Sequence, residues 1–165
     1  MSEDPKSLAE MAEHEFFRCR RRALGLTQAQ VAERVGSTQP AIADLEAGKR
    51  PISARIHHLL ETALAADPAQ LLDQHREDIR AAVQNAGLEN PRIFGSVARG
   101  ESTAKSDIDL FVDFPEGVRR SAFILFALAD DLENILSVAV DVRTPPYVLD
   151  GRAEYLRAEA EAVAL

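Results

Sequence analysis

Hydrophobic residues in the first 66 positions repeat with the spacing of α-helices. From Leu8 to Ala23 they recur three or four positions apart, and similar spacing continues to about residue 66. Thr27, Thr38 and Ser53 each stand where a helix N-cap is expected, and a glycine follows the helix that precedes each of them. The sequence therefore predicts an all-α region whose helices cover residues 7–24, 28–35, 39–47 and 53–63.

After residue 66 the pattern changes, because short stretches of alternating polarity now stand between the helical ones. Ile108, Leu110 and Val112 alternate with Asp107 and Asp109, which is typical of a strand with one buried face. Strands alternating with helices predict an α/β fold, here a mixed sheet with flanking helices. We expect strands at residues 92–94, 106–114 and 138–143, and helices at residues 68–86, 98–101, 119–136 and 152–163.

The two patterns predict two small domains, residues 1–66 and 67–165. Consecutive helices join them, with no linker rich in Gly, Ser or Pro. The net charge of −8 belongs to the second domain alone, because the first contains nine basic and nine acidic residues. An acidic second domain is poorly suited to general nucleic-acid binding, whereas basic residues cluster at 18–22 and 49–55 in the first.

Composition also restricts where the protein works. The sequence has no apolar stretch of about eighteen residues, so no membrane-spanning helix is expected. Its first residues are polar and acidic, unlike a signal peptide. Cys19 is the single cysteine, which excludes an intrachain disulfide. We therefore expect a cytoplasmic protein with no membrane partner.

The chemistry of the second domain centres on two carboxylates. Asp107 and Asp109 are two positions apart in a predicted strand and so project from the same face. Adjacent carboxylates repel each other unless a positive charge lies between them, and Mg²⁺ is a hard cation that prefers oxygen ligands. The turn at Gly95 and Ser96 can bring backbone amides close to a phosphate. The alternative is a solvated acidic strand after a glycine turn.

This stretch resembles the nucleotidyltransferases related to DNA polymerase β, and more narrowly the minimal nucleotidyltransferases. The resemblance covers about the last three-fifths of the chain and rests on Gly95, Ser96, Ala98, Arg99, Gly100, Ser106, Asp107, Asp109 and Leu110. It implies that a strand further along the chain supplies a third acid. The implied catalytic residues, which are also ligands of two Mg²⁺ ions, are Asp107, Asp109 and Asp141.

The same resemblance implies ATP as the nucleotide donor, bound by Gly95, Ser96, Arg99 and Ser106. A hydroxyl of the acceptor would attack the α-phosphate, and pyrophosphate would leave. For Arg99 the alternative is an ion pair with Glu101 or Asp113.

Residues 18–66 resemble the Xre-type helix-turn-helix domains of phage repressors. The residues that carry this resemblance are Gly25, Leu26, Thr27, Gln28, Ala32, Gly36, Ile42, Glu46 and Gly48. By this resemblance Gln39 begins the recognition helix and reads base edges, for which a glutamine amide suits adenine. The other residues expected at the DNA, mostly on phosphates, are Thr27, Gln28, Thr38, Lys49 and Arg50. Asp44 departs from the family, which often carries a basic or neutral polar residue on the exposed face of this helix, and a carboxylate there repels phosphate. The alternative is a helical bundle that binds protein.

Together the two resemblances imply an antitoxin that attaches AMP to a HEPN-like toxin and represses its own operon by binding operator DNA. It is expected to act as a dimer on DNA or as a hetero-oligomer with the toxin. Two alternatives stay open. One is a transcriptional regulator whose transferase half is inactive or only senses nucleotide, and the other is a nucleotidyltransferase that modifies small molecules such as antibiotics.

Overall fold

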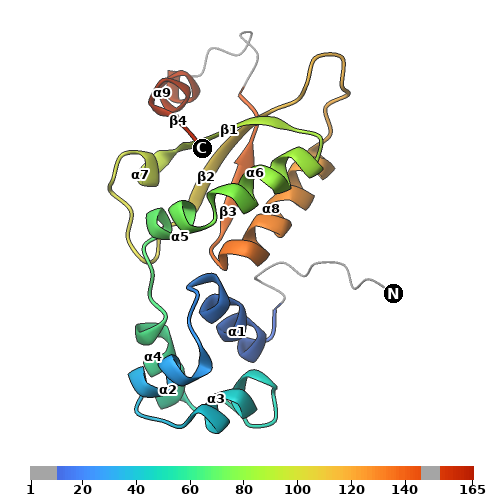
Figure 1. Ribbon diagram of the computed structural model, residues 1–165. Coiled ribbons are helices and arrows are strands. Elements are labelled where there is room, and N and C mark those ends of the chain that lie inside the picture. Colours follow the sequence, from blue (N-terminus) through green and yellow to red (C-terminus); the bar gives the residue numbers. More distant parts are fainter. Residues whose placement is uncertain (1–10, 146–152) are drawn as a thin grey trace.

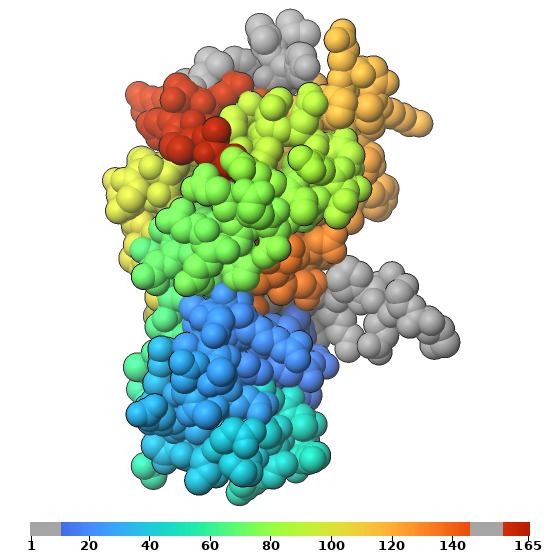
Figure 2. Space-filling view, viewed as in Figure 1, coloured from blue at the N-terminus to red at the C-terminus, as the bar shows by residue number. Residues whose placement is uncertain are grey.

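The computed structural model describes residues 11–145 and 153–165 of the chain. Two stacked parts are visible in Figure 1: a bundle of short helices, coloured blue to teal, and above it a sheet with helices around it. Figure 2 shows these two parts in direct contact. None of the helices within these two ranges has the length and apolar character needed to cross a bilayer.

Four short helices form the N-terminal bundle: α1 (Glu13–Ala23), α2 (Gln28–Arg34), α3 (Gln39–Glu46) and α4 (Ala54–Ala63). Phe17, Val31 and Ile42 are at the centre of their core and are each at most 3% exposed. Burial of such side chains stabilises a small bundle whose helices would be too short to persist alone. The predicted all-α fold of this region is therefore confirmed.

The predicted N-caps of this bundle are only partly correct. The Thr27 hydroxyl accepts a hydrogen bond from the Gln30 amide, and the Ser53 hydroxyl accepts one from the Ile56 amide. The Thr38 side chain, in contrast, makes no capping bond to α3. The first helix begins at Glu13, later than predicted, and the predicted start at residue 7 lies outside the described residues.

The C-terminal part builds a four-stranded mixed sheet in the order β3-β2-β1-β4. Strand β2 runs parallel to β3, while β1 is antiparallel to both β2 and β4, so the predicted mixed sheet is confirmed. Along the chain the elements are α5 (Pro68–Gln74), α6 (Arg76–Asn85), β1 (Glu89–Phe94), α7 (Gly95–Ala98), β2 (Ile108–Asp113), α8 (Ala122–Leu136), β3 (Val140–Arg143), α9 (Ala153–Glu161) and β4 (Val163–Ala164).

The two faces of β2 have different surroundings. Ile108, Leu110 and Val112 are at most 1% exposed and belong to the core that α6 and α8 build against the sheet. On the other face Phe111 stacks on Phe94 of β1, with 3.8 Å between the ring centroids. Strand alternation therefore directs Asp109 to the face away from α6 and α8. The predicted alternation is thus confirmed, and it decides which face carries the acids.

One predicted helix is wrong as a single element, because residues 68–86 form two helices that meet at His75. One ring nitrogen of His75 lies 2.8 Å from the carbonyl oxygen of Ala23 in α1, and the other lies 3.0 Å from Asp78. These contacts hold His75 at φ −110°, outside regular helix geometry. No glycine or proline marks this break, so the local sequence does not show it.

Other element bounds also differ from the prediction. Strand β2 begins at Ile108, which leaves Asp107 just before the strand. The short helix predicted at 98–101 lies instead at Gly95–Ala98, directly on the end of β1. The short strand β4 was not predicted, because two residues give no recognisable alternation.

The two halves are connected by more than the chain itself. Arg20 in α1 is only 8% exposed, and its guanidinium donates to the carbonyl oxygens of Leu64, at 3.2 Å, and Ser137, at 2.7 Å. Ser137 ends α8, so this one side chain joins the helical bundle to the α/β part. Ala23 of α1 even belongs to the C-terminal core. The domain boundary at residues 66 and 67 stays a prediction.

Candidate active site and DNA-binding face

The turn after β1 brings the backbone directly against a carboxylate. Gly95 has a φ of +72°, a conformation that residues with a Cβ rarely adopt. A Cβ at this position would lie 2.2 Å from Oδ2 of Asp109 and would collide with it. Only glycine therefore allows the turn and the Asp109 side chain to lie this close together.

The three predicted catalytic carboxylates lie in one neighbourhood. In the parallel pairing of β2 with β3, Asp109 stands opposite Asp141, and exposed Asp107 immediately precedes β2. Partial burial raises the pKa of Asp109, and the negative charges of Asp107 and Asp141 raise it further. Arg143 and Arg99 act in the opposite direction on the same pKa. The carboxylates are thus close enough to interact, as a shared site requires.

Asp141 forms an ion pair with Arg143, a residue that was not predicted to belong to the site. Oδ2 of Asp141 accepts a hydrogen bond from Nε of Arg143 at 2.9 Å and a second from the same guanidinium. That guanidinium carbon also lies 5.9 Å from the centroid of the Phe94 ring. The pairing of Arg143 with Asp141 could have been predicted, because the two are separated by two positions in a strand and so point to the same face.

The donor set suits a hard divalent cation, although the acids do not surround a common point. Among the described residues, no group of three or more His, Cys, Asp or Glu side chains is arranged to hold a metal ion. Mg²⁺ in phosphate-transfer sites commonly takes one or two carboxylates, with substrate phosphates and water completing its shell. Asp107 and Asp109 can supply those carboxylates, since Asp107 lies close enough to raise the pKa of Asp109 beyond the effect of burial.

Two of the predicted nucleotide-binding residues already have protein partners. Nε of Arg99 donates to Glu101 at 2.8 Å, which is one of the two ion pairs considered as its alternative role. This bond raises the pKa of Arg99. The Ser106 hydroxyl accepts from the Thr103 amide at 3.0 Å, so it holds the loop before β2.

Asp113, the other partner considered for Arg99, is engaged elsewhere. It pairs instead with Arg92 at 2.8 Å. Ser96, which follows Gly95 in α7, is half-buried. The structure thus places Gly95 against Asp109, with Ser96 next in the chain, whereas Arg99 and Ser106 form hydrogen bonds with neighbouring protein groups.

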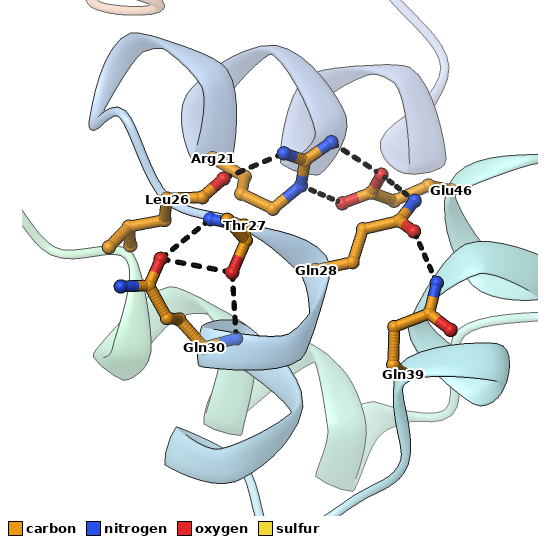
Figure 3. Close-up of polar contacts among 7 residues, drawn as sticks. All are labelled: Arg21, Leu26, Thr27, Gln28, Gln30, Gln39 and Glu46. Atoms are coloured by element: carbon orange, nitrogen blue, oxygen red, sulfur yellow. Dashed lines mark hydrogen bonds and ion pairs between the residues drawn. The ribbon is translucent and has the colours of Figure 1, made fainter.

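A chain of hydrogen bonds organises the helix-turn-helix (Figure 3). The Arg21 guanidinium donates to both carboxylate oxygens of Glu46, at 2.6 and 2.9 Å, and Gln28 donates to the same carboxylate at 2.9 Å. Burial opposes ionisation of Glu46, but the bonds from Arg21 and Gln28 outweigh it and lower the pKa. The side-chain amide nitrogen of Gln39 then donates to the side-chain amide oxygen of Gln28 at 2.8 Å.

This chain determines what Gln39 can offer. Because Gln28 uses its amide nitrogen on Glu46, its oxygen must accept from Gln39, whose own oxygen faces outward as an acceptor. Gln39 is exposed at the first position of α3, where a recognition helix enters the major groove. The arrangement holds an exposed glutamine in a defined orientation, as reading of a base edge would require.

The remaining residues predicted at the DNA lie on the same bundle. Thr27, Thr38, Lys49 and Arg50 are all exposed, in agreement with a role on phosphates. Nζ of Lys49 lies 3.7 Å from Asp44, the residue that departs from the repressor pattern. This pairing partly neutralises the Asp44 carboxylate, so the charge that would repel DNA is reduced.

Fold and site together define a nucleotidyltransferase that carries a helix-turn-helix. The chain belongs to the nucleotidyltransferase domain family, whose sequence profile matches residues 72–162, and a helix-turn-helix profile matches residues 18–71. The two matches meet within α5, close to the predicted domain boundary.

Relatives of known name agree with this membership. The chain is 40% identical over 75 residues to "Putative protein adenylyltransferase MJ1215" of Methanocaldococcus jannaschii, covering 46% of this chain and 81% of the relative. It is 35% identical over 72 residues to "Protein adenylyltransferase MntA" of Thermococcus cleftensis, covering 44% and 68%. A solved structure titled "Structure of putative minimal nucleotidyltransferase" is 35% identical, with a TM-score of 0.50, and the match covers 59% of this chain and 95% of that one.

Proposed function

We propose that this protein transfers AMP from ATP to a hydroxyl group of a partner protein. The approach of Gly95 to Asp109 supports the proposal, since it brings a glycine turn directly against one of three neighbouring carboxylates. The names of the related proteins, which are protein adenylyltransferases, support a protein acceptor. We further propose that the acceptor is a HEPN-like toxin, that modification silences it, and that the helix-turn-helix represses the operon.

The reaction exchanges one bond at the α-phosphorus for another. An oxygen–phosphorus bond forms from the acceptor hydroxyl, the bond to the bridging oxygen breaks, and pyrophosphate leaves. Asp107 and Asp109 would hold Mg²⁺, which orients the phosphate oxygens and neutralises charge when it is bound. Asp141 would accept the proton of the attacking hydroxyl and release it to water, once its ion pair with Arg143 opens. Backbone amides after Gly95 would hold the leaving phosphates together with Ser96.

One observation favours a second candidate function, a regulator that binds nucleotide without transferring it. Arg99 and Asp141, two residues expected to act on the substrate, are both engaged in ion pairs within the chain. If these pairs persist when ATP is bound, the site would hold a nucleotide but would lack a proton acceptor.

Intact-mass spectrometry of the neighbouring gene product, co-expressed with this protein, distinguishes the two functions. Wild-type protein should add one or more AMP masses to the partner, and Asp107→Asn or Asp109→Asn should abolish the addition. Asp113→Asn is the matched control, because Asp113 ends the same strand but pairs with Arg92 away from the site. A partner that stays unmodified in the presence of wild-type protein would contradict the transfer of AMP and favour the regulator that only binds nucleotide.

A further inference from the structure

Helix α8 exposes an apolar face to solvent. Phe123 is 84% exposed and Phe126 is 68% exposed, and exposed Ala122 and Ala127 lie beside them. The opposite face of the helix is buried in the core through Leu128, Leu132 and Leu136. The orange atoms of this helix reach the surface along one side of the molecule in Figure 2. We call Ala122, Phe123, Phe126 and Ala127 the outer face of α8.

Opposite charges stand at the two ends of this outer face. Arg119 is exposed three residues before the helix begins, and partly exposed Asp130 follows Ala127 by three residues. Neither side chain forms an ion pair with another residue in the part of the chain that the structure describes. Two large apolar groups therefore lie midway between a positive end and a negative end.

Such a pattern is complementary to itself when two copies meet antiparallel. With the two helices aligned at a point between residues 124 and 125, Ala122 of one copy stands opposite Ala127 of the other, and Phe123 opposite Phe126. Arg119, in the loop just before the helix, then lies at the end where Asp130 of the other copy stands. Each contact then occurs twice, as a two-fold interface requires. Small residues opposite each other allow the helices to come close, while the aromatic pairs fill the centre. A parallel arrangement would instead place like charges together.

We propose that the outer face of α8 docks on the same face of a second copy of this chain, in antiparallel orientation. The contact area of a single helix face is at the small end for a specific interface, so we expect a weak dimer. The carboxylate site stays open in this dimer, because Asp109 lies on the sheet face away from α8.

The proposed dimer also determines where the two DNA-binding faces point. Arg20 of the helical bundle binds the carbonyl oxygen of Ser137, so the bundle lies at the C-terminal end of α8. Antiparallel pairing then places the two bundles at opposite ends of the dimer. One such dimer contacts two separate DNA segments instead of two adjacent half-sites, which differs from the dimer on a single operator expected from the sequence.

Sedimentation of the purified full chain over a range of concentrations tests the interface. Wild-type protein should pass from monomer to dimer, and the double variant Phe123→Ser with Phe126→Ser should weaken the dimer at least about tenfold, since aromatic groups at an interface centre carry most of the affinity. Val163→Ser is the matched control, because Val163 is 56% exposed on β4, away from α8. Circular dichroism checks that each variant is folded.

A charge exchange tests the antiparallel orientation. Arg119→Asp alone and Asp130→Arg alone should each weaken self-association, because each places like charges opposite each other twice. Mixing the two variants should restore association, since both opposing pairs then have opposite charges. A chain that is monomeric at every concentration, a dimer that survives the Phe double variant, or a mixture that fails to associate would each overturn the proposal.

Discussion

At the scale of single residues, Gly95 and Asp109 show how closely this site is packed. The glycine provides a left-handed turn, and the missing Cβ leaves room for the carboxylate. Asp109 in turn is kept in a partly buried position next to two other acids, which is unfavourable for its charge. A site that concentrates negative charge in this way is suited to bind a cation together with phosphates.

Replacing Gly95 by alanine should therefore disable the site. The new Cβ must push Asp109 aside, and displacement of a reacting group by about 1 Å can cost about 100-fold in rate. Gly100→Ala is the control, because Gly100 has a similar φ of +69°, but a Cβ added there would meet no atom of the described residues within 4 Å. Both variants should lose roughly 1 kcal/mol of unfolding free energy from the strained backbone. Transfer assays and chemical denaturation measure the two effects, and equal activity in both variants would contradict this account.

Asp109→Asn should change stability in a pH-dependent way. The pKa of Asp109 is raised in the folded state, so ionisation of this group costs folding free energy as the pH rises through that value. The variant should consequently be more stable than wild type near neutral pH. The difference should vanish below the ordinary value of 3.8, where the carboxyl is protonated in both folded and unfolded chains. Urea denaturation at several pH values measures it, and a variant that is less stable at neutral pH would contradict the prediction.

At the scale of elements, the helix-turn-helix depends on one polar chain that links three helices. Arg21 of α1, Glu46 of α3 and Gln28 of α2 are joined around a carboxylate that is only 7% exposed. The last member, Gln39, lies in solvent at the start of α3. The buried ion pair thus orients an exposed amide through a single intervening side chain.

Two substitutions should separate base reading from phosphate binding. Gln39→Ala should relax the base preference and cost about 1–3 kcal/mol on the preferred sequence. Lys49→Ala should weaken binding to all sequences alike and lower the salt slope by about 1. Fluorescence anisotropy with operator and unrelated DNA at several salt concentrations measures both. A uniform loss for Gln39→Ala on every sequence would place Gln39 on the backbone instead.

At the scale of the whole molecule, a buried arginine, which pairs with no carboxylate among residues 11–145 and 153–165, joins the two halves. The guanidinium of Arg20 binds backbone carbonyls of Leu64 and Ser137, and burial lowers its pKa. His75 adds a second connection through the carbonyl of Ala23. A DNA-binding bundle attached in this way keeps a defined orientation relative to the nucleotidyltransferase part.

Arg20→Ala should weaken this connection measurably. Two buried carbonyl groups lose their donor, which should cost about 1–3 kcal/mol of unfolding free energy. Arg34→Ala is the control, because Arg34 also donates to a backbone carbonyl, that of Ala63, but at an exposed position within the helical bundle. Thermal denaturation of the full chain should show a clear loss for Arg20→Ala alone. Equal stability of the two variants would mean that the contact between the halves contributes little.

The sequence by itself determined the class of each half and the elements with strong local signals. Alternation around Ile108 indicated the central strand, Thr27 marked a helix start that the structure contains, and the Gly95 turn with Asp107 and Asp109 indicated the nucleotidyltransferase family. These features depend on period and on residues near in sequence, so they can be read locally. The roles of the site residues stay predictions.

Only the tertiary structure decided the features that join distant residues. The break at His75 depends on a carbonyl 52 positions away, and the connection between the halves joins Arg20 to a residue 117 positions away. Likewise, the pairing of β2 with β3 sets Asp141 opposite Asp109, where Arg143 holds it. Such contacts leave no local period in the sequence, because the partner is chosen by how the elements pack.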